Sequence, residues 1–321
     1  MLNRRHLLSL GASAALPLRA FAQDPWPARS IRAVNPGAAG GTNDVLTRHL
    51  LEPLGKLLGQ PVILESKAGA GGVIGTQFVA QQPADGYTIL THHNGFITAP
   101  LVSANANYDA LKDFVPLSLQ GTSPLILIAH PSMPPTLAEF VAHARANPGK
   151  LEWGTAALGG VGHLATEVFH DATGIKGMVK VAFSGSAPAT QALVAGQIKY
   201  LLSTPTAATA GLVQEGRLRF LGVSSAARSP LLPNLPSISE VAPGFAVEVW
   251  FGLLARAGTP PAVVARLADA IASVISQPDI IDKYRAVNVV ARPGRNELAE
   301  LLRGDHQLWS KVVREKNIRL D

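Results

Sequence analysis

Short runs of apolar residues alternate with longer stretches in which apolar residues recur every three or four positions. The first run covers residues 31–35, and residues 42–58 follow with Leu46, Leu50 and Leu54 at helical spacing. A short, mostly apolar run fits a buried strand, and a period near 3.6 residues fits an amphipathic helix. The pattern therefore predicts a strand followed by a helix at the start of the fold.

The same alternation continues to the end of the chain. It predicts strands at residues 61–65, 87–92, 151–155, 178–182, 198–202, 220–224 and 287–290. It predicts helices up to residue 82, at 137–146, 163–173, 188–195 and 206–215, and from residues 260 and 296. Residues 94–109 are rich in Asn and Ala and are expected to be loosely structured. Alternating strands and helices are typical of an α/β fold with largely parallel strands.

Two longer apolar segments, residues 114–130 and 247–255, interrupt this alternation. We expect the chain to cross between two domains at each of them. Lobe 1 is then discontinuous, with residues 23–122 and 250–321, and lobe 2 comprises residues 123–249. Open α/β sheets bind ligands at the carboxyl ends of their strands, so two facing lobes predict a binding cleft.

The N-terminal residues 1–22 have the pattern of a signal peptide. Arg4 and Arg5 precede an apolar stretch, and Ala20-Phe21-Ala22 forms an A-x-A cleavage pattern before Gln23. The arginine pair resembles a twin-arginine export signal but lacks the usual Phe and Lys, so the export route stays open. We expect an exported protein that is cleaved near Ala22.

Composition excludes several classes of function. Without Arg4, Arg5 and Arg19, the 28 basic residues fall to 25 against 22 acidic residues, a net charge of +3. This charge is too weak and too dispersed for a nucleic-acid-binding surface. The chain has no cysteine, which excludes disulfides, thiolate metal sites and cysteine nucleophiles. Beyond the first two dozen residues, no apolar run approaches the ~18 residues of a membrane span.

Three loops between a strand and a helix are unusually rich in glycine and other small residues, at 36–44, 66–75 and 155–163. Glycines at a helix start let backbone N–H groups approach a ligand, and the positive end of the helix dipole attracts an anion. No loop ends in Gly-Lys-Ser/Thr, so none is a P-loop. Residues 160–165 fit G-x-G-x-x-A, but the next strand ends without the acidic residue that a dinucleotide site needs. Together the loops predict an anion site.

Single polar residues offer little evidence for catalysis. Asp44 could act as an acid, but in the first turn of a helix a capping role is favoured. His163 could hydrogen-bond a carboxylate or cap its own helix, and both interpretations stay open. His92 and His93 point to opposite faces of a strand, which suits a metal poorly. Ser186 is not in a nucleophile elbow. We expect no catalytic site, no metal site and no cofactor.

The order of these motifs resembles the tripartite tricarboxylate transporter substrate-binding proteins, the Bug receptor family. The matching segments, in family order, are PGAAGGTNDVLTRHL, ESKAGAGGVIG, PADGYTIL, KDFVPLSL, GTAALGGVGHLATEVF, GSAPATQALVAGQIKYL and LPSISEVAPGFAVEVWFGLLARAGTP. They cover nearly the whole chain after residue 22. The resemblance implies a two-lobed periplasmic binding protein of type II (Venus flytrap), in which each lobe is a mixed sheet flanked by helices and the lobes close on a small carboxylate.

The resemblance also implies which residues surround the ligand. One carboxylate is placed on the backbone of residues 38–42, with residues 69–72 beside it and the second lobe opposite. The implied ligand-binding residues are Ala38, Ala39, Gly40, Gly41, Thr42, Asp44, Gly69, Ala70, Gly71 and Gly72 in lobe 1, and Thr155, Ala156, Gly160, His163, Gly185, Ser186, Ser203 and Thr204 in lobe 2. Where many relatives read VPYKG, this chain has Val181 to Gly185 without the Tyr and Lys, so ligand identity does not transfer.

The expected function is that of a monomeric receptor in the periplasm. It would capture a small organic acid or amino acid and present it to membrane transporter subunits. Two alternatives remain from the sequence: an exported sensor that docks on a membrane signalling protein, and an exported α/β enzyme acting on a carboxylate or ester. The second alternative lacks a nucleophile or metal set.

Overall fold

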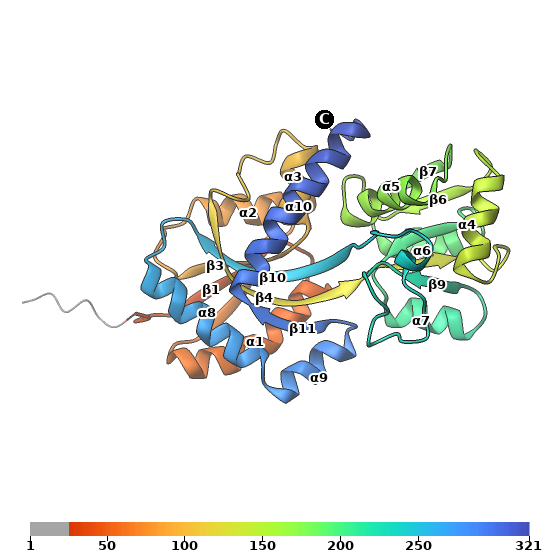
Figure 1. Ribbon diagram of the computed structural model, residues 1–321. Coiled ribbons are helices and arrows are strands. Elements are labelled where there is room, and N and C mark those ends of the chain that lie inside the picture. Colours follow the sequence, from red (N-terminus) through yellow and green to blue (C-terminus); the bar gives the residue numbers. More distant parts are fainter. Residues whose placement is uncertain (1–25, 321) are drawn as a thin grey trace, which may run out of the picture.

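The computed structural model describes residues 26–320. The predicted signal peptide, residues 1–22, lies outside the described residues. Two β-sheets, each flanked by helices, form the two halves of the molecule and lie side by side (Figure 1). This architecture confirms the predicted α/β class with two mixed sheets. Within the described part, no helix combines the length and hydrophobicity that crossing a membrane requires.

The first sheet has six strands in the order β11-β4-β10-β3-β1-β2. Its strands are β1 (Ile31–Asn35), β2 (Val62–Ser66), β3 (Thr88–His93), β4 (Phe114–Pro124), β10 (Glu248–Arg256) and β11 (Val290–Gly294). The strands β1, β2 and β3 are parallel, and β10 pairs antiparallel with both β3 and β4. The first sheet is therefore mixed, with its parallel part at the N-terminal end of the chain.

Helices cover both faces of the first sheet (Figure 1). One face carries α1 (Thr42–Leu58), α8 (Pro261–Ile275) and α9 (Pro278–Ala286), and the other carries α2 (Val73–Ala80), α3 (Gly95–Val102) and α10 (Arg295–Glu315). The helix α1 buries Leu46, Leu50 and Leu54 against the sheet, as their helical spacing predicts. Burying each leucine contributes roughly 1.5–3 kcal/mol relative to leaving it exposed.

The second sheet has five strands in the order β7-β6-β8-β5-β9. They are β5 (Ile126–Ala129), β6 (Glu152–Thr155), β7 (Val179–Ala182), β8 (Tyr200–Ser203) and β9 (Arg219–Val223), and the flanking helices are α4 (Leu137–Ala146), α5 (Val161–Thr173), α6 (Ser186–Val194) and α7 (Ala207–Gln214). Along β5, Ile126 and Ile128 join one core cluster, while Leu127 joins the other. This period of two residues shows that both faces of the sheet are covered.

The chain passes between the two sheets at the ends of β4 and β10. Glu248, the first residue of β10, pairs with Pro124, the last residue of β4. Only Leu125 separates β4 from β5 of the second sheet, and its side chain is buried. The two crossings therefore lie side by side.

Two helices differ from the sequence-based expectation. Residues 94–109 were expected to be loose but contain α3, where Phe96 and Ile97 are fully buried. Gly95 and Pro100 lower its helix propensity, and tertiary burial compensates. The helix α9 was not predicted as a separate element, although Pro278 stands at its first turn, where proline begins a helix.

One strand also differs in its bounds. The strand expected at 287–290 begins only at Val290.

Candidate functional site

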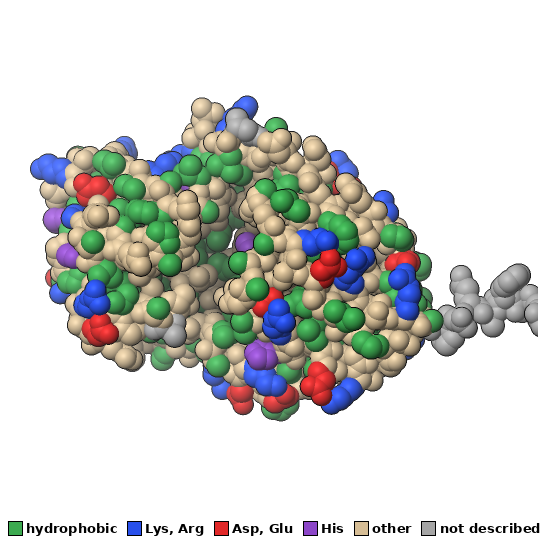
Figure 2. Space-filling model, turned by 180° about the vertical axis from the view of Figure 1, so that it is seen from behind, with side chains coloured by type: hydrophobic (Ala, Val, Ile, Leu, Met, Phe, Trp, Pro, Cys, Tyr) green, Lys and Arg blue, Asp and Glu red, His purple; other side chains and the backbone are tan. Residues whose placement is uncertain are grey.

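A cavity of about 350 Å³ lies between the two sheets. Its walls come from residues just beyond the carboxyl ends of β1 and β3 in the first sheet and of β6 and β8 in the second. Figure 2 shows the molecule hollowed between its two halves. The strand ends of the two sheets thus meet at one site, as expected for open α/β sheets.

The loop after β1 forms the first wall, and Asp44 fixes its shape. The carboxylate of Asp44 accepts hydrogen bonds from Gly40 N at 3.0 Å and from Arg48 Nε at 2.7 Å. Asn35 Nδ2 donates to the same carboxylate at 3.3 Å. Burial alone would raise the pKa of Asp44, but these hydrogen bonds and the Arg48 charge hold it below its usual value. Asp44 is thus an ionised acceptor inside the protein.

Helices that begin at the cavity leave their first N–H groups without a side-chain cap. The N-cap residues of α1, α5 and α6 are Gly41, Gly160 and Gly185, and none provides a capping side chain. The other two helices of the second sheet, α4 and α7, are capped by the side chains of Thr136 and Thr206. Uncapped first-turn N–H groups bind water or an anion. The cavity is therefore supplied with backbone donors from both sheets.

His163 supports the second wall from behind and does not line the cavity. Its side chain is buried, and Nδ1 accepts a hydrogen bond from Gly159 N at 2.9 Å. Its Nε2 lies 3.0 Å from Lys180 Nζ and 3.6 Å from Glu167 Oε1. His163 and Lys180 hold the pKa of the Glu167 carboxyl below its usual value. His163 does not cap α5, because Gly159 precedes the helix and α5 has no side-chain cap. A hydrogen bond from His163 to a ligand carboxylate stays a prediction.

Most of the residues expected at the ligand meet in this region. Those that line the cavity of about 350 Å³ are Ala38, Gly41, Thr42, Thr155, Ala156, Gly160, Ser186, Ser203 and Thr204. Gly69, Ala70, Gly71 and Gly72 line an adjoining cavity of about 650 Å³. Among the described residues, five of those expected at the ligand line neither cavity, and they shape the loops behind the two cavities. They are Ala39, Gly40, Asp44, His163 and Gly185.

Sequence reasoning missed several residues that line the first cavity. His93 ends β3, and Phe251 of β10 pairs with it in the antiparallel register. Leu125 and Val249 line the cavity at the two crossings, and Asn35 ends β1. The rule that strand ends line the cleft would have indicated His93 and Asn35. The pairing of β10 with β3 has no signal in the sequence.

Neither cavity is lined by Lys, Arg, Asp or Glu among residues 26–320. The polar groups that face the first cavity are hydroxyls, amides, one imidazole and backbone N–H groups. Such neutral dipoles can hold an anion without a cationic partner. Over the same residues, no group of three His, Asp or Glu side chains is arranged to hold a metal ion.

Comparison with known proteins agrees with this geometry. A family model described as "Tripartite tricarboxylate transporter family receptor" matches residues 46–318. BugT of Bordetella pertussis (strain Tohama I) is 33% identical over 319 residues, which cover 96% of this chain and 95% of BugT.

Two solved structures are also similar over most of the chain. One is Rpa4515 of R. palustris with adipate, with a TM-score of 0.79 and 32% identity over 92% of this chain and 99% of that one. The other is the periplasmic binding protein BugD, with a TM-score of 0.75 and 29% identity over 92% of this chain and 99% of that one. The chain therefore belongs to the receptor family of the tripartite tricarboxylate transporters, whose members include the Bug proteins.

Proposed function

We propose that this protein captures a small carboxylate between two lobes in the periplasm and delivers it to a membrane transporter of the tripartite tricarboxylate type. The observation that carries this proposal is the convergence of uncapped helix starts on one neutral cavity. The helix α1 comes from the first sheet, and α5 and α6 come from the second. Rpa4515, the similar protein of known structure, is described with adipate, a dicarboxylate.

Residues 23–122 and 250–321 form lobe 1 in this proposal, and residues 123–249 form lobe 2. The crossings at Leu125 and Val249 serve as the hinge, because only these two segments connect the sheets within the described part of the chain. Both residues also line the cavity. Rotation at the hinge would bring Thr155 and Ser203 towards the loop after β1.

The carboxylate would lie between backbone N–H groups of residues 38–42 and the start of α5. The hydroxyls of Thr42, Ser186 and Thr204, which line the same cavity, are further donors. A site made of neutral donors binds more weakly than one with a desolvated ion pair, which favours release to a transporter. Catalysis, cofactors and further subunits have no part in this proposal, and the mature protein would begin near residue 23.

A thermal-shift screen of mono- and dicarboxylates tests the proposal. A ligand at a hundred times its dissociation constant should add ~2.7 kcal/mol to the free energy of unfolding. Ser203→Ala removes a hydroxyl at the cavity and should weaken binding of the best acid several-fold. Ser276→Ala is the matched control, because Ser276 lies at the end of α8, and its Oγ donates to Ala272 O at 2.9 Å. A screen in which no carboxylate stabilises the protein would contradict the proposal.

A further inference from the structure

The second cavity, of about 650 Å³, adjoins the first and is walled by the loop of residues 69–72, α3 and residues 157–161. The residues that line both cavities are Gly37, Ala38, His93, Ala157, Gly160 and Val161. His93 is the one residue of these six with a polar side chain. It therefore stands where the two cavities meet.

Apolar side chains dominate the lining of the second cavity, among them Val73, Ala99, Val102 and Leu158. No charged side chain of residues 26–320 lines it. At the start of α2, a short 3-10 turn already bonds Gly72 N to Gly69 O at 2.9 Å, so this N–H group is not free for a ligand. A second carboxylate would be desolvated here without a cationic partner, which is unfavourable. An apolar group would instead gain ~25 cal/mol per Å² of surface buried.

His93 presents a hydrogen-bond donor at this junction. Its Nδ1 accepts a hydrogen bond from Gly95 N at 3.1 Å, so the proton of the neutral ring is on Nε2. Burial lowers the pKa of His93 to about 4, and the ring is neutral at pH 7. His93 is half-buried and lines both cavities, so its ring borders open space. The Nε2–H group is therefore the donor that this ring can offer to a ligand there.

His92, in the wall of the second cavity, is the same tautomer as His93, with its proton on Nε2. Its side chain is fully buried, and Nδ1 accepts from His93 N at 2.8 Å. Its Nε2 has no hydrogen-bond partner and lies under Gly72, where an added Cβ would be 2.8 Å away. A buried donor without a partner costs roughly 1–3 kcal/mol unless a ligand or water satisfies it. Besides these two imidazoles, the polar side chains that line the second cavity are Thr98, Ser103 and Asn105, and the other side chains in its lining are apolar.

We propose that His93 divides the ligand site, with the carboxylate in the first cavity and an apolar body that carries an acceptor oxygen in the second. His93 Nε2 donates a hydrogen bond to that oxygen. The ligand is therefore a monocarboxylate with an aromatic or aliphatic body, not a small diacid. This inference rests on the proposed function, because it takes the carboxylate position from it.

Three acids measured by isothermal titration calorimetry test the role of His93. Phenylbutyrate and benzoylpropionate share one skeleton and differ by one carbonyl, while succinate lacks the apolar body. The protein should prefer benzoylpropionate to phenylbutyrate by about tenfold, the effect of one satisfied donor. His93→Phe should abolish this preference, and His143→Phe on α4, outside both cavities, should retain it. Equal affinities in the wild type, or an unchanged preference in His93→Phe, would overturn the role of His93.

Filling the second cavity tests where the apolar body lies. Ala99→Trp on α3 should weaken binding of both phenyl acids at least tenfold. Leu158→Trp is a second filling variant at a tolerant position, since Leu158 is 43% exposed. Phenyl acids that bind both variants as they bind the wild type would overturn the inference. So would a wild type that binds succinate but neither phenyl acid. Binding of none of the three acids would contradict the proposed function itself, and this inference with it.

Discussion

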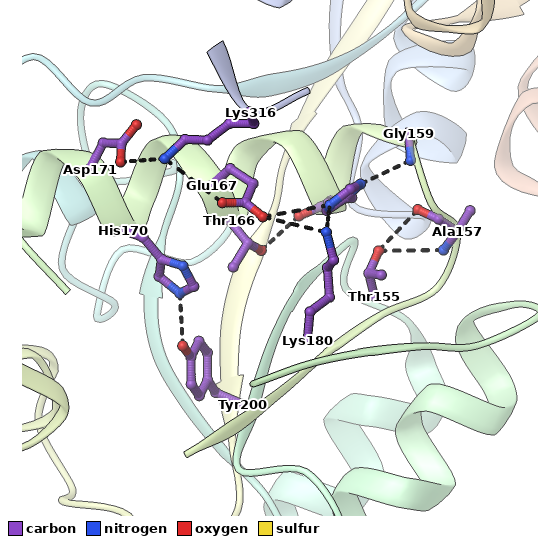
Figure 3. Close-up of polar contacts among 12 residues, drawn as sticks. Thr155, Ala157, Gly159, Thr166, Glu167, His170, Asp171, Lys180, Tyr200 and Lys316 are labelled. Carbon is purple, nitrogen blue, oxygen red and sulfur yellow. Dashed lines mark hydrogen bonds and ion pairs between the residues drawn. The ribbon is translucent and has the colours of Figure 1, made fainter. Parts of the chain in front are cut away.

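Lys316 Nζ lies 2.6 Å from Asp171 Oδ1 and thereby joins the two halves of the molecule outside the cavity (Figure 3). Lys316 is the C-cap residue of α10, which packs on the first sheet, and Asp171 belongs to α5 of the second. The same ammonium group lies 3.9 Å from Glu167 Oε2. Glu167 in turn faces His163, which supports the loop at the cavity. The helix start that lines the cavity is thus connected to the C-terminal helix.

A double-mutant cycle of Lys316→Ala and Asp171→Ala should detect this connection. Asp171 is 60% exposed, so the coupling free energy without ligand should be only about 0.5 kcal/mol and should decrease in high salt. Hinge closure would move α5 relative to α10, and a saturating carboxylate should therefore change the coupling. Chemical unfolding with and without the ligand measures it. The same coupling in both states would contradict a closure that moves these helices apart or together.

Two neighbouring glycines should respond differently to alanine. Both have positive φ, 67° at Gly71 and 99° at Gly72, so either substitution costs ~1 kcal/mol in backbone strain. An added Cβ at Gly71 meets no atom within 4 Å, but at Gly72 it would lie 2.8 Å from His92 Nε2. Gly72→Ala should therefore lower the free energy of unfolding by ~1–3 kcal/mol more than Gly71→Ala. Urea unfolding measures both variants. Equal losses of unfolding free energy in the two variants would show that the His92 side chain can move aside without destabilising the protein.

The sequence predicts the helices and strands whose apolar residues recur with a clear period. It fails where contacts between distant segments determine the secondary structure. The spacing of Leu46, Leu50 and Leu54 indicates α1, and all three are buried in the structure. The helix α3 has Gly95 and Pro100 and no amphipathic pattern, because its surroundings bury it on several sides. Local patterns cannot report such surroundings.

The candidate site shows the same division. Glycine-rich loops are visible in the sequence because a helix start near a ligand needs small residues, and Ala38, Gly41, Thr42 and residues 69–72 line the two adjoining cavities. His93 and Phe251 are 158 residues apart in the chain and meet through the antiparallel pairing of β3 with β10. The sequence left the role of His163 open, and in the structure its Nδ1 accepts a hydrogen bond from Gly159 N while the residue lines neither cavity.

Asp44→Asn should weaken ligand binding without removing any ligand contact. The carboxylate holds Gly40 N and Arg48 Nε at 3.0 and 2.7 Å, and an amide cannot accept both with the same strength. We expect a loss of ~1–3 kcal/mol in unfolding free energy and a several-fold weaker affinity, since residues 38–42 lose their support. Glu52→Gln is a matched control on the same helix. It breaks a pair with Lys56 at 2.7 Å, but Glu52 is 79% exposed. A loss of affinity as large in this control would contradict the role of Asp44.

Acid should destabilise the protein in a window set by its buried histidines. Burial lowers the pKa of both His93 and His170 to about 4, from 6.5 in an unfolded chain. The unfolded state therefore binds protons first, and the stability present above pH 6.5 is lost as pH falls towards 4. At about pH 5.5 each histidine should account for a loss of ~1 kcal/mol in unfolding free energy.

Urea unfolding at pH 8 and 5.5 measures the difference in unfolding free energy between the two pH values. His170→Gln should reduce it, because it removes one of these titrations. A pH dependence that is the same in wild type and His170→Gln would show that His170 does not resist protonation.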